Sequence, residues 1–205
     1  MQTEELIMAD ILYTYKNQVY ANITNKCNCA CTFCVRSLHD SVGDSETLWH
    51  EKEPTLDEIL KAIDAFDFTG YDELVYCGYG EPTCALDNLI ASAKYVKEKT
   101  GIKIRLNTNG LGNLQHQRNI VPELKDVVDN VSISLNAPTS EKYQAVSRPR
   151  FENAFEALLD FASLSKEAFA HTQLSIVDVL PEEDIKVCQR LADEREVFLK
   201  IRHFS

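Results

Sequence analysis

The sequence predicts an α/β fold built on a parallel sheet, and three observations support this prediction. First, six segments with strand patterns alternate with helical segments. Second, strand runs such as "VSISL" suit a sheet covered by helices. Third, polar residues follow the ends of the expected strands. Such alternation gives parallel strands joined by right-handed crossovers. An open doubly wound sheet and an incomplete α/β barrel both satisfy the pattern. The 205 residues fall short of the roughly 250 of a complete eight-unit barrel.

The expected strands are short apolar or alternating runs bounded by turn residues. They cover residues 19–24, 72–78, 102–110, 130–136, 172–180 and 197–204. A helix is expected after each of the first five strands, at residues 55–67, 85–101, 119–129, 150–166 and 181–196. Thr55 and Glu58 form a capping box for the first helix, Gly101 ends the second, and Pro181 stands in the first turn of the last.

Composition limits the class of protein. We expect a single domain over residues 1–205, with residues 1–17 as an N-terminal extension and residues 35–54 as a lid loop. A net charge of −11 argues against a broad nucleic-acid surface, which needs clustered Lys and Arg. The sequence lacks both a membrane-spanning apolar run and a leader peptide, so we expect a cytoplasmic protein whose thiols stay reduced.

Special residues follow four successive expected strands. The first strand leads into a cysteine cluster, the second into "GYGEPT" (78–83), the third into "NTNG" (107–110) and the fourth into "SLNAP" (134–138). The carboxyl ends of parallel strands meet at one edge of a sheet, where α/β proteins place their active sites. We therefore expect one site at this edge.

The stretch "CNCACTFC" places four cysteines within residues 27–34. Without Cys29, the spacing is Cys27-x3-Cys31-x2-Cys34, which lets three thiolates reach three corners of one iron–sulfur cube. A structural zinc site is the alternative, formed by all four cysteines or by two of them with Cys77 and Cys84. The spacing favours iron and sulfur over zinc, and a disulfide is disfavoured in a reducing compartment.

These residues resemble the radical S-adenosylmethionine (SAM) superfamily. The resemblance rests on C-x3-C-x-Φ-C, with Phe33 as the aromatic Φ, and on "GYGEP" at residues 78–82. The stretches "NITNKCN", "CGYGEPT", "LNTNG", "SISLNAP" and "VLPEEDI" also resemble, in order, the TatD-associated radical SAM proteins. The resemblance implies a partial (β/α)6 TIM-type barrel of parallel strands.

The resemblance also implies a cofactor set and its ligands. One [4Fe–4S] cluster would cleave SAM reductively to a 5′-deoxyadenosyl radical, which abstracts hydrogen from an unknown, small-molecule substrate. Cys27, Cys31 and Cys34 would be the cluster ligands, and no catalytic side chain is assigned. The implied SAM contacts are Phe33, Gly78, Tyr79, Gly80, Glu81, Asn107, Asn109, Ser134, Asn136 and Val179. Tyr79 departs from the family pattern, in which this position is glycine.

Partners and alternatives follow from the same resemblance. It implies a flavodoxin- or ferredoxin-type electron donor, an oxygen-sensitive enzyme and a functional link to a TatD-type hydrolase. One alternative is an activating enzyme that generates a radical on a partner protein. Another is a non-enzymatic, zinc-stabilised binding module. The expected lid at residues 35–54 favours a small-molecule substrate, and the roles of Cys29, Cys77 and Cys84 stay open.

Overall fold

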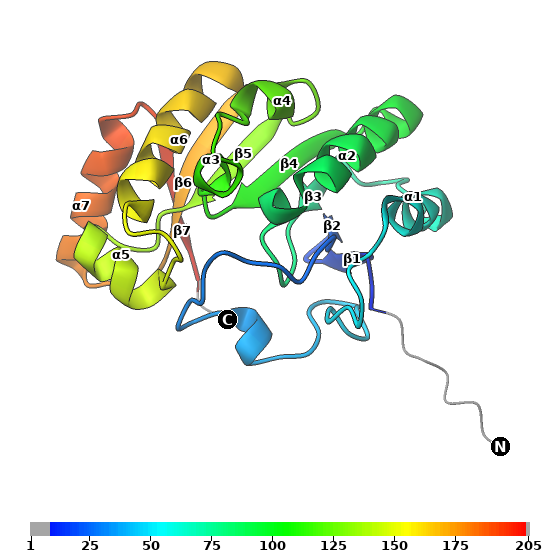
Figure 1. Cartoon of the computed structure of the whole chain (residues 1–205), viewed down its shortest axis with the longest axis horizontal. Helices are drawn as coiled ribbons and strands as arrows, with labels where there is room; N and C mark the ends of the chain where they lie inside the picture. The colour runs from blue at the N-terminus through cyan, green and yellow to red at the C-terminus, as the bar shows by residue number, and fades with distance from the viewer. Residues whose placement is uncertain (1–8, 204–205) are drawn as a thin grey trace.

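The computed structural model describes residues 9–203, which form one seven-stranded sheet with helices on one of its faces (Figure 1). The strands pair in sequence order, β1 to β7, and only β1 is antiparallel to its neighbour. They are β1 (Leu12–Tyr15), β2 (Gln18–Ala21), β3 (Glu73–Tyr76), β4 (Lys103–Thr108), β5 (Asn130–Ser134), β6 (His171–Val177) and β7 (Phe198–Arg202). The six parallel strands confirm the α/β prediction, and helices on a single face rule out a doubly wound sheet.

The helices connect successive parallel strands on the outer face of the sheet (Figure 1). They are α1 (Leu56–Ala65), α2 (Leu86–Thr100), α3 (Gly112–His116), α4 (Val121–Lys125), α5 (Ser140–Ser147), α6 (Ala154–Ala168) and α7 (Glu182–Asp193). Two 3-10 turns are η1 (Val35–Ser37) and η2 (Pro82–Ala85). None of the helices in the described part of the chain is long and apolar enough to span a bilayer.

Local signals in the sequence correctly marked several helix ends. Thr55 and Glu58 form both halves of the capping box at α1. Gly101 ends α2 with a φ of 70°, the left-handed conformation that glycine adopts without strain. Pro181 immediately precedes α7.

Other boundaries differ from the prediction. The helix expected at residues 119–129 is confined to Val121–Lys125, and the one expected to begin at residue 150 begins at Ala154. The helices α3 and α5 were not predicted. Part of the expected N-terminal extension is the strand β1, joined to β2 by a tight turn whose Lys16 and Asn17 both have positive φ. Residues 1–8 of that extension lie outside the described residues.

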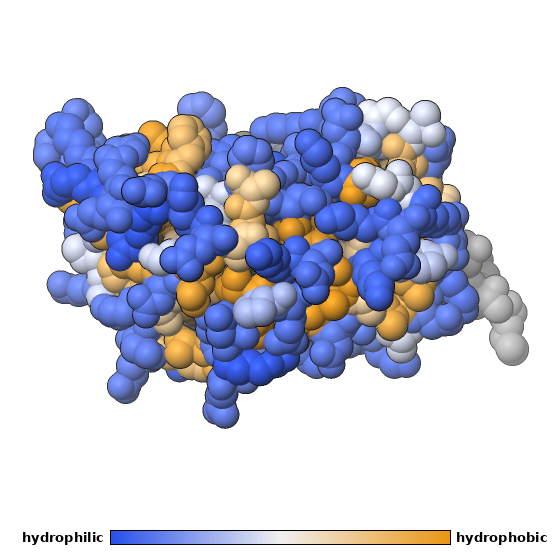
Figure 2. Space-filling model, turned by 90° about the horizontal axis from the view of Figure 1, so that it is seen from above, coloured by the Kyte–Doolittle hydropathy of each residue, from blue (hydrophilic) through white to orange (hydrophobic). Residues whose placement is uncertain are grey.

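The main core lies between the sheet and the helices. Strand alternation directs four fully buried side chains toward the helices: Leu74, Ile104, Ile133 and Leu174. Removing each from water stabilises the fold by roughly 1.5–3 kcal/mol. The Tyr76 hydroxyl also bonds the Ser92 hydroxyl on α2 at 2.8 Å. Seen from the helical side, hydrophobic side chains show mainly between helices whose outer surfaces are hydrophilic (Figure 2).

The opposite face of the sheet, here called the inner face, is polar. Alternation along β2–β7 directs to it the side chains of Gln18, Tyr20, Glu73, Val75, Arg105, Asn107, Asn130, Ser132, Gln173, Ser175, Lys200 and Arg202. Several of them bond one another, because Asn130 donates to Glu73 at 2.7 Å and Gln173 donates to Ser132 at 3.0 Å. The fold therefore buries one face of its sheet against the helices and presents hydrogen-bonding groups on the other.

Candidate active site

The cysteine-bearing loop, residues 22–34, leaves the carboxyl end of β2 and runs toward α5 (Figure 1). There its backbone pairs with the last residues of α5: Ala30 N–H donates to Ser147 O at 3.1 Å and Thr32 N–H donates to Val146 O at 2.9 Å. An isolated antiparallel bridge joins Cys29 to Pro149. The loop is thus held by backbone hydrogen bonds at a fixed place beside the ends of the strands.

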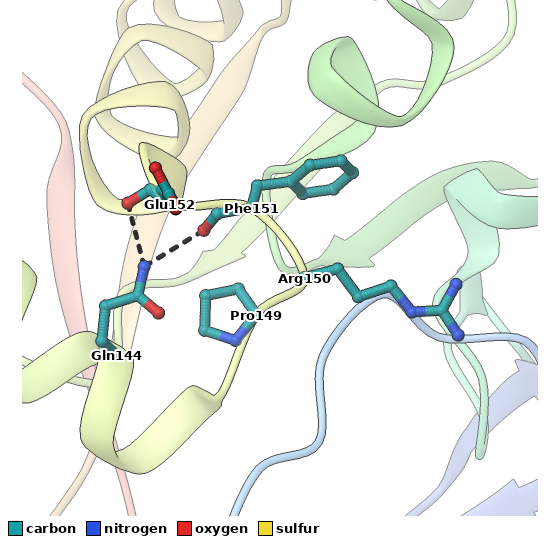
Figure 3. Close-up of a pocket in the computed structure, with 5 residues that line it drawn as sticks. All are labelled: Gln144, Pro149, Arg150, Phe151 and Glu152. Carbon is teal, nitrogen blue, oxygen red and sulfur yellow. Dashed lines mark hydrogen bonds between the residues drawn. The ribbon is translucent and has the colours of Figure 1, made fainter.

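The segment that follows α5, beside the cysteine-bearing loop, is held in place by a side chain of α5. Gln144 Nε2 on α5 donates to Phe151 O at 3.1 Å and to Glu152 O at 3.0 Å (Figure 3). A shallow hollow of about 300 Å³ lies among these residues. The Arg150 side chain points away from Gln144, toward the ribbon of the cysteine-bearing loop (Figure 3). Its backbone N–H bonds Asn28 O at 3.0 Å.

The three expected cluster ligands are free thiols in half-buried positions. Cys27 and Cys31 pack against the main core, and Cys34 lies where η1 begins. Burial raises the pKa of Cys27 to about 11. Hydrogen bonds from Cys29 and then Ser147 lower the pKa of Cys31 to about 7, with burial acting against them. The loop therefore supplies three free thiols, the side chains that bind iron once they are deprotonated.

Cys29 differs from the other three thiols because it is buried, with 6% of its surface exposed. Its thiol lies 3.9 Å from Asn28 Oδ1 and 3.5 Å from Asn109 Nδ2. The hydrogen bond to Cys31, followed by burial, raises the pKa of Cys29. These contacts hold Cys29 inside the protein, and its exclusion from the ligand set stays a prediction.

The "GYGEP" turn follows β3 and packs directly on the cysteine-bearing loop. Glu81 N–H donates to Lys26 O at 2.8 Å. A Cβ on Gly80 would lie 2.2 Å from Thr24 O, and one on Gly78 would lie 2.1 Å from Asn22 Oδ1. Both glycines are therefore needed because the turn approaches the end of β2 too closely for any side chain.

The Glu81 carboxylate is enclosed by neutral donors. Oε1 accepts from the Thr83 hydroxyl at 2.8 Å and the Thr108 hydroxyl at 2.7 Å, and Oε2 accepts from Asn109 N–H at 2.7 Å. The side chain is 4% exposed, and burial raises the pKa of Glu81. None of the ion pairs among residues 9–203 includes it. A buried carboxylate with hydrogen bonds but no cation favours binding of a positively charged ligand group.

The remaining expected contacts lie at neighbouring strand ends. Asn107 and Ser134 are half-buried on β4 and β5, while Asn109 follows β4 directly. Asn136 has a φ of 59°, and its buried Oδ1 has no hydrogen-bond partner. Val179 was expected on a strand, but β6 ends at Val177, so Val179 lies in the following turn and is 61% exposed.

The two aromatic members of the expected set have different surroundings. Phe33 is half-exposed between two of the cysteines. Tyr79 is 3% exposed, and its ring packs against Trp49 with 5.2 Å between centroids. Its hydroxyl donates to His39 O. Tyr79 therefore connects the turn to the segment 35–54.

Asn22, at the end of β2, bonds both to the segment 35–54 and to the "GYGEP" turn. Its Oδ1 accepts from Tyr79 N–H at 3.2 Å, and its Nδ2 donates to Leu48 O at 2.8 Å. Asn25 adds a bond from its Nδ2 to His50 O at 2.6 Å, and Thr24 donates to Glu53 at 2.6 Å. The segment is held to the end of β2 along much of its length.

Sequence reasoning missed four residues that build this site. Asn22, Asn28 and Thr108 lie inside the motifs "NITNKCN" and "LNTNG", so position next to the expected ligands was the available signal. Ser147, which bonds Cys31, lies more than a hundred residues from it, and nothing local marks it.

Comparison with known proteins decides the family. A model of the radical SAM superfamily matches residues 21–192, which is most of the chain. The chain belongs to the radical SAM superfamily. Radical SAM proteins are enzymes that use a [4Fe–4S] cluster and SAM, so the chain is an enzyme rather than a non-enzymatic zinc module.

The relatives of this radical SAM chain are named for different activities. A Methanocaldococcus jannaschii protein named as a glycyl-radical enzyme activating enzyme is 31% identical over 166 residues, covering 78% of this chain and 62% of the relative. A protein of Caldanaerobacter subterraneus subsp. tengcongensis, named as a dual-specificity RNA methyltransferase, is 28% identical over 136 residues. That match covers 64% of this chain and 36% of the relative. The chain thus spans less than two thirds of the length of these relatives.

Solved structures agree on the fold. SuiB of Streptococcus suis, solved with SAM bound, superposes with a TM-score of 0.64 at 19% identity, covering 91% of this chain and 40% of SuiB. At this identity the likeness shows the fold alone. The radical SAM chain is accordingly a partial TIM barrel, and the barrel alternative of the sequence analysis is confirmed.

The residues of this structure fit the two cofactors of the family. Three free thiols on one fixed loop match a cube with three protein ligands. The buried Glu81 carboxylate lacks a cation, which the SAM ammonium can supply, and the buried Asn136 Oδ1 lacks a donor, which a ribose hydroxyl can supply. For a single metal ion, no group of three or more His, Cys, Asp or Glu side chains is suitably arranged within residues 9–203.

Proposed function

We propose that this chain is a radical SAM enzyme acting on a small molecule held against the inner face of its partial barrel. The observation that carries the proposal is the direct packing of the "GYGEP" turn on the cysteine-bearing loop, through Glu81 N–H and Lys26 O. This contact brings a set of thiols and an unpaired buried carboxylate to adjoining strand ends.

In this proposal, Cys27, Cys31 and Cys34 hold the cluster, which leaves one iron for SAM. When bound, the cluster and SAM supply an electron and a 5′-deoxyadenosyl radical able to abstract hydrogen from a substrate. The protein contributes position and exclusion of water. Tyr79 and the segment 35–54 cover the strand ends on the β2 side, which limits solvent access there.

The SAM contacts in this proposal divide by chemistry. The carbonyls of the 78–81 turn and the Glu81 carboxylate receive the ammonium, because a primary ammonium is a donor only. Asn107, Asn109, Ser134 and Asn136 offer amides and hydroxyls to the carboxylate and ribose of SAM. Phe33 and Val179 present apolar surface to the adenine.

The segment 35–54 supports a small-molecule substrate, because it folds over the strand ends instead of leaving a peptide-sized groove beside β2. The second candidate is an activating enzyme that makes a radical on a partner protein. Its support is the 31% identity to the relative named as such an enzyme. The motif resemblance alone supports four further parts of the proposal: the TatD-associated subgroup, a link to a TatD-type hydrolase, a flavodoxin- or ferredoxin-type electron donor, and oxygen sensitivity. A cytoplasmic location belongs to the proposal on the character of the sequence.

The test is anaerobic reconstitution with iron and sulfide, followed by SAM and dithionite and an assay for 5′-deoxyadenosine. We expect a four-iron cluster and slow formation of 5′-deoxyadenosine and methionine. The matched control is the triple Cys27→Ser/Cys31→Ser/Cys34→Ser variant, which should form neither. A spectroscopically intact four-iron cluster that yields no 5′-deoxyadenosine would contradict the proposal.

A further inference from the structure

We propose that Lys200 and Arg202 on β7 form an anion-binding subsite, and that the substrate of this enzyme carries a carboxylate or phosphate group. The proposal deepens the proposed function and rests on it, because it names the chemical class of that substrate. Its basis is the placement of charge on the inner face of the sheet.

Lys200 and Arg202 point to the same side of the sheet. They are two residues apart on one strand, so their Cα atoms are separated by about 7 Å and their side chains share a face. Lys200 pairs in register with Ser175 on β6, which in turn pairs with Ser134 on β5. Leu199, the neighbour of Lys200 on β7, packs into the core on the helical side, so strand alternation directs Lys200 and Arg202 to the inner face.

Charge on the inner face is opposite in sign to that of the protein. The chain as a whole carries −11. On the inner face, however, strand alternation places Lys103, Arg105, Lys200 and Arg202 against the single acid Glu73. A concave surface lined by one sign of charge concentrates ligands of the other sign.

Arg105 is already neutralised. It forms an ion pair with Glu73 at 3.2 Å, with both side chains 16% exposed, and donates to Gln18 Oε1 at 3.0 Å. Lys200 and Arg202 take part in none of the side-chain ion pairs found between residues 9 and 203. Lys103 is also outside those ion pairs but lies at the amino end of β4, so Lys200 and Arg202 are the unpaired cations nearer to the carboxyl ends of the described strands, where SAM is expected.

A cavity of about 490 Å³ lies beside Lys200, toward the amino ends of β6 and β7, and Arg202 is not part of its lining. Its lining combines Lys200, Arg105 and Lys166 with the acids Glu73 and Glu196, the amides of Asn130 and Gln173, and the exposed ring of Phe198. The cavity leaves the Lys200 side chain open to solvent on the inner face, while the proposed anion contact lies between Lys200 and Arg202 along β7.

The subsite faces the strand ends where SAM is expected. Cys77, just beyond β3, is affected by both guanidinium groups: burial raises its pKa, while a hydrogen bond from Asn107 and the charges of Arg202 and Arg105 lower it. The two arginines therefore act on the same interior space. An anion held at β7 would leave the rest of a small substrate extending toward β4 and β5.

Binding of two probe anions to the anaerobically reconstituted protein tests this inference without SAM or reductant. Inorganic phosphate is followed by phosphorus NMR and succinate by isothermal titration, both at low ionic strength, because screening weakens exposed charge pairs. We expect saturable binding that falls at least tenfold, or about 1.4 kcal/mol, in Lys200→Gln/Arg202→Gln. The stronger probe identifies the anion as phosphate or carboxylate.

Two further variants serve as controls. Lys200→Arg/Arg202→Lys keeps both charges and should keep binding. Lys61→Gln/Lys94→Gln removes two charges from exposed helical positions and should also keep it. Circular dichroism establishes that each variant is folded. Equal affinity in wild type and Lys200→Gln/Arg202→Gln, or no saturable binding of either probe by wild type, would overturn the inference. Because no SAM is cleaved in this experiment, its failure is separate from failure of the proposed function.

Discussion

The amide of Asn109 donates to Asn28 Oδ1 across 2.6 Å, which links the end of β4 to the middle of the cysteine-bearing loop. The same amide nitrogen lies 3.5 Å from the sulfur of Cys29. Asn109 also gives its backbone N–H to Glu81 at 2.7 Å. One residue thus fixes the thiol loop and the buried carboxylate relative to each other.

This link separates Cys29 from its three neighbours. We predict that Cys29→Ser keeps iron and SAM cleavage, because Cys29 is buried and already bonded within the protein. Cys27→Ser, Cys31→Ser and Cys34→Ser should each lose activity and most of the cluster. Iron content, visible absorbance and 5′-deoxyadenosine yield after anaerobic reconstitution measure these outcomes. Loss of the cluster in Cys29→Ser with retention in Cys27→Ser would show that the ligand assignment is wrong.

Glu81→Gln should weaken SAM binding roughly ten- to a hundredfold, since hydrogen bonds to charged groups contribute about 1.5–3 kcal/mol. The cluster should remain, because Glu81 is not one of its expected ligands. Equilibrium titration of SAM into the reconstituted protein measures the change. Glu123→Gln, at an exposed ion pair with Arg118, is the matched control and should bind as wild type does. Unchanged affinity in Glu81→Gln would assign the ammonium contact to the backbone carbonyls.

Tyr79 should contribute strongly to stability despite replacing a glycine of the family pattern. Tyr79→Ala removes a nearly fully buried ring and is expected to lower the free energy of unfolding by about 3–5 kcal/mol. Tyr79→Phe loses only the bond to His39 O, worth about 1 kcal/mol. Urea unfolding compares the two. Equal losses in both variants would contradict the packing of this ring between the turn and segment 35–54.

His50 should make the stability of the protein depend on pH. Burial lowers its pKa below 6.5, and its Nε2 lies 2.9 Å from Asn22 O. A depressed histidine pKa contributes stability that is present above the unfolded pKa and lost as pH falls through the folded pKa. We expect wild type to lose more stability than His50→Gln between about pH 7.5 and about pH 5.5 in urea unfolding. A His50→Gln variant with the same pH dependence as wild type would refute the assignment.

Periodicity predicted the six parallel strands because each places apolar residues on the helical side, as Ile104 and Leu106 do on β4. It missed β1, because the sequence of that strand, Leu-Tyr-Thr-Tyr, does not alternate clearly between apolar and polar residues. It also missed α5, whose buried residues are limited to Tyr143 and Ser147. Short elements carry too few residues for a period to show.

The sequence predicts the candidate site most directly where the expected ligands follow one another closely, as Cys27, Cys31 and Cys34 do. The site was not predictable where the support comes from far along the chain. The inward turn of the Glu81 carboxylate depends on Thr108, and the position of the cysteine-bearing loop depends on Val146. These pairings are set by tertiary packing, which local patterns do not record.

The backbone contact between Thr32 and Val146 also bears on biogenesis. A ribosome releases the cysteines early, but the chain that pairs with them follows 114 residues later. Strands that pair in sequence order allow the sheet to grow one unit at a time during synthesis. Because its backbone partners lie at the end of α5, we expect the cysteine-bearing loop to reach its final position only after α5 has been synthesised.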